Sequence, residues 1–253
     1  MNINMPHVSQ IPALRALWKE AFEDTDEFLD IFFKKIFHPK RCRCISDGEQ
    51  VTATLYWFDC LHEGKKIAYI YAVATAKSCR GQGLCRKLMD DTHHHLASLG
   101  YEGALLVPGS KELFEMYEKM SYQTCSAVRE FQCKAQPQEL QLLEIDQFEY
   151  AKLRKLLLPK GSVVQENENL DFLQTYAHFY MGLGFLLAAF VENDTLLGIE
   201  LLGDITAAPA ITYTLGYEKG SFRTIGNGRP FAMYHSLGDS TLLPPSYFAF
   251  AFD

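Results

Sequence analysis

The chain carries a short glycine-containing turn between two apolar segments, and its residue types suit the binding of an anion. Residues 80–85 read Arg-Gly-Gln-Gly-Leu-Cys. Gly81 and Gly83 allow the backbone to curl so that successive N–H groups point into one concavity. A helix that starts directly after the turn adds the positive end of its dipole. Together these features suit a pyrophosphate group.

A strand and a helix must hold this turn in place. The run Ile67–Thr75 is rich in Ile, Tyr and Val and is too short to cross a membrane, which favours a buried strand. Beyond the turn the spacing of the larger side chains predicts a helix with one buried face. The residues on that face are Leu84, Leu88, His95, Leu96 and Leu99.

The turn resembles the acetyl-CoA-binding loop of the GNAT acetyltransferase superfamily, which reads Arg/Gln-x-x-Gly-x-Gly/Ala after the fourth strand. Arg80 and Gly83 match this pattern, and Cys85 stands where the family usually has Gly or Ala. A cysteine is still small enough to let a phosphate approach the backbone. The resemblance implies that acetyl-CoA is bound by Arg80, Gly81, Gln82, Gly83, Leu84, Cys85 and Arg86.

A second segment is similar to another part of the same family. Residues 110–122, SKELFEMYEKMSY, follow an apolar strand at Ala104–Val107 and resemble the family segment Asn-x-x-Ala-x-x-x-Tyr-Glu-Lys-Leu-Gly-Phe. The resemblance implies that Ser110, which replaces Asn, lies at the cofactor and that Tyr117 protonates the CoA sulfur. Another interpretation is that Tyr117 is a core aromatic, because it shares one helical stripe with Leu113 and Phe114.

The resemblance also assigns a role to the backbone. GNAT strands four and five splay apart at a bulge, and N–H groups of strand four hold the pantetheine arm and polarise the thioester carbonyl. By position this role falls to Val73, Ala74 and Thr75. The general base stays open, because Tyr71 and Ala72 stand where many relatives have a carboxylate. Its candidates are Asp59, His62, the acidic run Glu23–Glu27 and the terminal carboxylate of Asp253.

The predicted elements divide the chain into two domains, 1–135 and 136–253. In the first domain we expect two helices at residues 9–22 and 25–37, three antiparallel strands, and then helix, strand, helix and a closing strand at Tyr122–Cys133. This is the order of the GNAT fold, an α+β fold in which helices flank a mixed, mostly antiparallel sheet. The polar segment Lys134–Glu139 marks the predicted boundary.

The second domain repeats the opening of the first in outline. A helix is predicted at Leu140–Leu158, and strands are predicted at Phe185–Val191, Leu196–Leu202, Ile211–Tyr217, Pro230–Ser236 and Tyr247–Phe252. No Arg-x-x-Gly-x-Gly loop and no Tyr-Glu-Lys helix can be found in this part. We therefore expect two tandem GNAT-like domains, of which the second is degenerate and does not bind CoA.

Composition limits the classes of partner. The chain has 253 residues and 48% hydrophobic content, which is enough for two ordinary cores. Residues 1–135 hold 17 Lys/Arg and 17 Asp/Glu, whereas residues 136–253 hold 7 and 14, so the net charge of −7 belongs to the second part. This argues against nucleic acid or an anionic membrane as partner. It suits a cationic acceptor such as an amine, and it equally suits a role in solubility alone.

Other features indicate a simple intracellular protein. No apolar run approaches the roughly 20 residues that a bilayer requires, and the first residues lack the profile of a signal peptide, so we expect a soluble, cytoplasmic chain. The seven cysteines contain no Cys-x-x-Cys pair, and His93–His95 face different directions on a helix, so we expect no metal. A homodimer is left open by the sequence.

The sequence therefore predicts an N-acetyltransferase that moves an acetyl group from acetyl-CoA to a primary amine of a small molecule or peptide by direct attack. The alternative is a GNAT fold that binds an acyl-CoA as a sensor or scaffold, without turnover. The missing carboxylate on the fourth strand keeps this alternative open.

Overall fold

The computed structural model describes residues 2–252, which divide into two units. The first unit contains the residues up to Gln123 together with Tyr234–Leu243. The second contains Thr124–Met233 together with the residues from Pro244 on. These units differ from the predicted ranges 1–135 and 136–253, because the chain passes from one unit to the other more than once. In the part of the chain described, no helix is long and apolar enough to cross a membrane.

The first unit is built on a sheet with the strand order β1-β2-β3-β4-β5-β13. Neighbours are antiparallel from β1 to β4, and β4 and β5 are parallel. The strands are β1 (Asn2–Asn4), β2 (Cys42–Asp47), β3 (Gln50–His62), β4 (Lys65–Thr75), β5 (Gly103–Leu106) and the end of β13 (Arg229–Ser236). The three predicted antiparallel strands and the buried strand at Ile67–Thr75 are confirmed.

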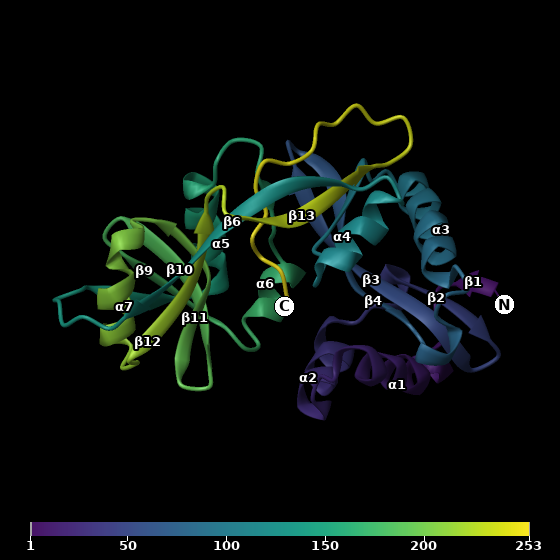
Figure 1. Ribbon diagram of the computed structural model, residues 1–253, viewed down its shortest axis with the longest axis horizontal. Coiled ribbons are helices and arrows are strands. Elements are labelled where there is room, and N and C mark those ends of the chain that lie inside the picture. The colour runs from purple at the N-terminus through teal and green to yellow at the C-terminus, as the bar shows by residue number, and fades with distance from the viewer. Residues whose placement is uncertain (1, 253) are drawn as a thin grey trace. The chain divides into compact units, whose positions relative to one another are not determined.

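Helices cover the two faces of this sheet, with α1 and α2 on one side of β3 and β4 and α3 on the other (Figure 1). They are α1 (Ile11–Phe22), α2 (Asp26–Ile31), α3 (Leu84–Ser98) and α4 (Lys111–Glu118). Short 3-10 turns lie at Val8–Gln10, Pro39–Arg41 and Lys77–Cys79, and a π-helical turn, Phe32–Ile36, continues α2. Side chains cap two of these helices, since the hydroxyls of Thr25 and Ser110 accept backbone N–H groups at the starts of α2 and α4.

The second unit has a similar order of elements, although the described residues include no helix in the place of α4. Its sheet runs β7-β9-β10-β11-β12-β6, with antiparallel neighbours except for the parallel pair β11 and β12. The strands are β6 (Gln123–Lys134), β7 (Leu142–Ile145), β9 (His178–Gly182), β10 (Phe185–Glu192), β11 (Thr195–Gly203) and β12 (Lys219–Ile225), with the short β8 (Val163–Val164). The helices are α5 (Gln147–Leu157), α6 (Glu168–Leu173) and α7 (Ala208–Thr214), with a 3-10 turn at Ile205–Ala207.

The two halves of the chain exchange their closing strands. β6 follows the helices of the first half in sequence, yet all of it beyond Gln123 belongs to the second unit, where it pairs with β12. β13 follows β12 in sequence, and its last residues, Tyr234–Ser236, belong to the first unit. The Tyr234 ring there packs directly against the Gly103 backbone of β5. Each sheet therefore has its last strand in the same position but from the other half of the chain.

Three predicted elements of the second half are wrong. The helix predicted at Leu140–Leu158 begins only at Gln147, because Asp146 caps it with bonds of 2.9 Å to two backbone N–H groups, and strand β7 precedes it. The strand predicted at Ile211–Tyr217 does not form: its first four residues are the end of α7, which has Pro209 in its first turn. Tyr247–Phe252 is buried throughout and forms no strand, only a single bridge from Tyr247.

An ion pair lies in the interior of the second unit. Arg154 on α5 binds Glu200 on β11 through two bonds, Nε to Oε2 at 2.6 Å and Nη2 to Oε1 at 2.9 Å. The two side chains are 1% and 0% exposed. The hydroxyls of Tyr150 and Tyr247 each donate to the same carboxylate at 3.1 Å. The pair therefore links the helix, the sheet and the C-terminal segment of this unit.

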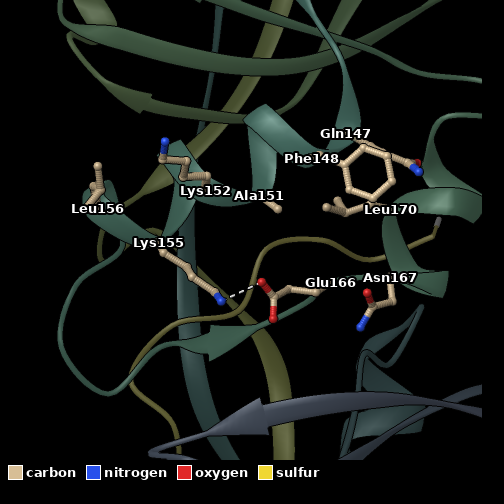
Figure 2. Close-up of a pocket in the computed structure, with 9 residues that line it drawn as sticks. All are labelled: Gln147, Phe148, Ala151, Lys152, Lys155, Leu156, Glu166, Asn167 and Leu170. Atoms are coloured by element: carbon tan, nitrogen blue, oxygen red, sulfur yellow. Dashed lines mark ion pairs between the residues drawn. The ribbon is translucent and has the colours of Figure 1, made fainter.

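We expect Arg154→Met to lower the free energy of unfolding by about 3–5 kcal/mol, because it leaves a buried carboxylate without its cation. The adjacent Lys155 provides the control. Its ammonium pairs with Glu166 at 2.6 Å, but these side chains are 49% and 27% exposed (Figure 2). Lys155→Met should therefore change stability by at most about 1 kcal/mol. Urea unfolding of both variants measures the difference, and equal losses would contradict this account of the core.

Candidate active site

A bulge interrupts the central strand of the first unit. β4 pairs with β5 only through Ile67, Ala68 and Tyr69, so the two strands separate beyond that point. On the other side the register with β3 skips two residues, Ala72 and Val73. Ala72 has a φ of +51°, which an L-residue adopts only at an energetic cost. The splay that the family resemblance implied is present, with Val73 in the bulge and with Ala74 and Thr75 directly after it.

The glycine turn lies between β4 and α3 and faces open space. Gly81 and Gly83 have φ values of +76° and +73°, in the left-handed region that glycine adopts without strain. Gly83 is the N-cap of the 15-residue helix α3 and supplies no side-chain bond to it. Apart from the neighbouring residues in the chain, no described atom lies within 4 Å of where a β-carbon would stand on either glycine. The first N–H groups of α3 are therefore accessible to an anion.

Positive charge surrounds this turn. Residues 77–87 contain four Lys or Arg residues and no carboxylate, and all four side chains are exposed. The Nε of Arg80 donates to the carbonyl of Thr75 at 3.1 Å, which ties the turn to the end of β4. Arg86 donates through Nη2 to the carbonyl of Lys119 at 2.8 Å, which ties α3 to the end of α4. Gln82 is exposed at the tip, and Leu84 anchors the helix in the core.

Tyr117 lies on α4, the helix whose end Arg86 ties to the first turn of α3. Its side chain on α4 is 6% exposed, and Cys85 is close enough to influence its ionisation. Burial first, and Cys85 second, hold the pKa of Tyr117 far above its usual range, so the hydroxyl stays protonated at neutral pH. Burial also raises the pKa of Cys85 to about 11. The fold thus brings the two predicted motifs together at one place.

The position of Ser110 has a local structural explanation. Its hydroxyl accepts the N–H of Leu113 at 3.4 Å and caps α4, the helix that carries Tyr117. The predicted contact of Ser110 with a cofactor stays a prediction.

Two of the candidate bases from the sequence lie far from the bulge. Asp59 pairs with Ala68 in the β3–β4 register and His62 pairs with Lys65, at the opposite end of β4. The Asp59 carboxylate also binds the Arg41 guanidinium at 3.0 Å. Both residues therefore lie toward the end of β4 that is remote from the bulge.

The acidic run between α1 and α2 is engaged in local contacts. Asp24 accepts the indole N–H of Trp18 at 2.7 Å, and Asp26 accepts the ammonium of Lys19 at 2.8 Å. These carboxylates fix the junction of the two helices. The remaining candidate, the terminal carboxylate of Asp253, lies outside the described residues.

Tyr117 packs against a group of rings that the sequence did not indicate. Tyr122 meets Tyr117 edge to face, with ring centroids 5.7 Å apart, and its hydroxyl lies 2.8 Å from Nε2 of His93. The His93 ring stacks on His235 at 4.4 Å, and Nδ1 of His235 donates to the carbonyl of Ser121. Since His235 arrives on β13, more than 100 residues later in the chain, no local sequence pattern could have revealed this group.

The buried imidazole of His93 should make the protein sensitive to acid. Burial, with smaller effects of His235 and His94, lowers the pKa of His93 to about 3. The unfolded chain binds this proton near pH 6.5, so the stabilisation is complete above pH 6.5 and is lost progressively as the pH falls from there toward 3. Between pH 7 and pH 5 we expect the free energy of unfolding of the wild type to fall by about 2 kcal/mol. His93→Gln should not show this loss, because the glutamine side chain does not titrate. Urea unfolding at the two pH values tests this, and parallel losses in both proteins would contradict it.

The second unit has no comparable turn. Between β11 and α7 its backbone forms only the 3-10 turn Ile205–Ala207, and Gly203 there packs against the carbonyl of Gly184. A cavity of about 410 Å³ lies between α5 and α6 (Figure 2). None of the predicted site residues lines it. In residues 2–252, no group of three or more His, Cys, Asp or Glu side chains is arranged to hold a metal ion.

Comparison with known families assigns the first unit. Residues 5–125 match the model of the acetyltransferase (GNAT) domain. This part of the chain is a GNAT domain. The chain is accordingly an acyltransferase by family, and its mixed sheet flanked by helices confirms the predicted α+β fold class. Among curated proteins, none matches the sequence.

Solved structures resemble the chain over almost its whole length. A GCN5-related N-acetyltransferase from Anabaena variabilis shares 15% identity and a TM-score of 0.72, with 92% of this chain and 72% of that chain covered. One from Kribbella flavida shares 13% identity and a TM-score of 0.68, covering 93% and 71%. Eis1 from Mycobacterium abscessus shares 9% identity and a TM-score of 0.67, covering 93% and 74%. The GNAT domain and the unit beyond it thus have counterparts of the same fold.

Proposed function

We propose that the protein is an N-acetyltransferase that transfers the acetyl group of acetyl-CoA to a primary amine. The observation that carries this proposal is the meeting of the two motifs of the GNAT domain. The left-handed glycines at the start of α3 face open space, and Arg86 in the first turn of the same helix bonds the carbonyl of Lys119, two residues beyond Tyr117. The four cations at residues 77–87 favour a ligand with several phosphate charges.

In this proposal the residues divide the work by position. The N–H groups at Gly81–Arg86 hold the diphosphate, and those of Val73–Thr75, freed from β5 by the bulge, hold the pantetheine arm and polarise the thioester carbonyl. Burial, and Cys85 after it, hold the pKa of Tyr117 above its usual range, so its hydroxyl carries a proton at neutral pH. Its hydroxyl is therefore available as a general acid.

The proposed transfer moves two protons: Tyr117 gives one to the sulfur, and the amine loses one that returns to Tyr117. The lone pair of a neutral amine attacks the carbonyl carbon, the N–C bond forms and the C–S bond breaks. The Tyr117 hydroxyl gives its proton to the departing sulfur, and the proton that the amine nitrogen loses passes through solvent and restores the hydroxyl. The products are an N-acetyl amide and free CoA thiol.

We propose that the second unit repeats the GNAT arrangement without the CoA site. The repeated order of strands and helices supports this, as does the 3-10 turn in place of a glycine turn between β11 and α7. The excess of acidic side chains in residues 136–253 then serves to attract an ammonium group or to keep the chain in solution.

The test has two measurements. Acetyl-CoA at micromolar concentration should raise the melting temperature, and a panel of primary amines should release CoA thiol in its presence. The proposal would be contradicted if acetyl-CoA gave no thermal shift and no other sign of binding. Binding without thiol release from any amine would support the acyl-CoA sensor instead.

A further inference from the structure

The cavity between α5 and α6 is large enough to hold a small molecule (Figure 2). Its volume of about 410 Å³ lies within the range of about 300–1,000 Å³ that is typical of ligand pockets. All of its lining residues belong to the second unit, and none of them has a part in the acetyl transfer proposed above. The chemistry of the lining indicates which ligand the cavity suits.

One wall of the cavity is apolar. Phe148 and Ala151 lie one turn apart on α5, and Leu170 on α6 lies beside them (Figure 2). Leu170 is buried, whereas Phe148 is 74% exposed. Contact of such a large ring with water is unfavourable, and a ligand that covers the ring removes this cost. The wall therefore suits an apolar group.

The other wall carries two opposite charges side by side. The Lys155 ammonium meets the Glu166 carboxylate at 2.6 Å, and Figure 2 shows both groups across the cavity from Ala151 and Leu170. The two side chains are 49% and 27% exposed, so their pairing contributes at most about 1 kcal/mol. A ligand that offers each of them an opposite charge replaces this pair at little cost.

Two further polar side chains of the lining have bonding capacity to spare. Asn167 is the N-cap of α6, yet its amide does not cap the helix and makes no hydrogen bond within the described residues. The backbone there has a φ of +50°, where a residue other than glycine is strained, and the amide lines the cavity. Lys152 also lines it and has no ion pair among the residues that the structure describes. The lining thus offers two ammonium groups, one carboxylate and a free amide.

We infer that this cavity binds an α-amino acid with an apolar side chain. Its carboxylate binds Lys155 and the Asn167 amide, and its ammonium binds Glu166. The apolar side chain covers the Phe148 ring. An α-amino acid carries both charges on one carbon atom, so the two charges reach neighbouring partners together. A plain carboxylate would place a like charge beside Glu166, and a plain amine would place one beside Lys155. The inference does not depend on the proposed acetyl transfer.

Three probes with the same phenyl group test this match of charges: L-phenylalanine, 3-phenylpropanoate and 2-phenylethylamine. The second probe lacks the amino group, and the third lacks the carboxylate. Calorimetry on the full chain, without acetyl-CoA so that no transfer occurs, gives the Kd of each. We expect the Kd of L-phenylalanine to be at least fivefold lower than that of either analogue, the equivalent of about 1 kcal/mol.

Lys155→Met tests the position of the ligand, and the variant should fold because the lost ion pair is exposed. The Kd of L-phenylalanine should rise at least fivefold, since its carboxylate loses a cation. The Kd of 2-phenylethylamine should not rise. Lys160→Met is the control, because Lys160 is exposed, follows shortly after α5 and does not line the cavity. This variant should keep all three Kd values.

Phe148→Ala tests the apolar wall. It should raise the Kd of all three probes at least threefold, because each of them places its phenyl group on this ring. Leu183→Ala is the control, since Leu183 is 94% exposed, belongs to the same unit and lies outside the cavity. It should leave the three Kd values unchanged.

Each result bears on one claim. If L-phenylalanine does not bind at millimolar concentration, the cavity is not an amino-acid site. If either analogue binds as tightly as L-phenylalanine, the recognition of both charges is wrong. If Lys155→Met and Lys160→Met, or Phe148→Ala and Leu183→Ala, have equal effects, the ligand binds elsewhere. The thermal shift with acetyl-CoA tests the proposed acetyl transfer separately, so either idea can fail alone.

Discussion

Tyr117→Phe should lower kcat roughly 100-fold while leaving the Kd of acetyl-CoA within about twofold of wild type. The substitution removes one hydroxyl from a buried ring and keeps its packing against Tyr122. The departing thiolate then lacks its proton donor, and general acids contribute about 10²–10⁴-fold in such reactions. Thiol release under saturating amine measures kcat, and calorimetry measures the Kd.

A matched substitution separates the acid from the loss of any hydroxyl. Tyr213 on α7 is 50% exposed and belongs to the second unit. Tyr213→Phe should leave kcat and the Kd unchanged. Wild-type kcat in Tyr117→Phe would show that the ring is only part of the core, the interpretation that its helical stripe left open.

Gly83→Ala should weaken acetyl-CoA binding at least tenfold. At a φ of +73° a β-carbon is strained by about 1–2 kcal/mol, and it projects into the open space where the diphosphate is proposed to lie. Gly100 at the other end of α3 is the control, because its φ is +79° and its surroundings are equally open. Calorimetry gives the Kd, and urea unfolding gives the stability.

The pair distinguishes strain from contact. Gly83→Ala and Gly100→Ala should lose similar stability, since both residues adopt the same left-handed conformation. Only Gly83→Ala should lose affinity. Equal affinities in the two variants would mean that the turn at Gly83 does not hold the phosphates.

The local part of the site was predictable from sequence because each motif is continuous. The turn at Gly81 and Gly83 and the helix after it depend on neighbours within a few residues, and both form as predicted. The bulge was predictable only through the family resemblance. Nothing in the residues around Ala72 specifies a positive φ, which arises where β4 must pair with β3 while leaving β5.

The rest depends on contacts that are distant in sequence. Ile211–Tyr217 has β-branched and aromatic residues typical of a strand. Its start is nevertheless helical, because Pro209 lies in the first turn of α7 and four residues of that helix are buried in the second unit. His235 and Tyr122 meet only after strand exchange has placed β13. The pairing of Arg154 with Glu200 spans 46 residues, and neither side chain carries a local sign of being buried.

The exchange of closing strands has a consequence for biosynthesis. The GNAT domain ends at residue 125 by family match, but the last strand of its unit is not synthesised until Ser236. Until then β5 is an open edge on a nascent chain, exposed to pairing with other strands. A nascent chain arrested at residue 135 should therefore be sensitive to protease and bound by chaperones. The first unit should become protected from protease only after about a hundred further residues have been synthesised.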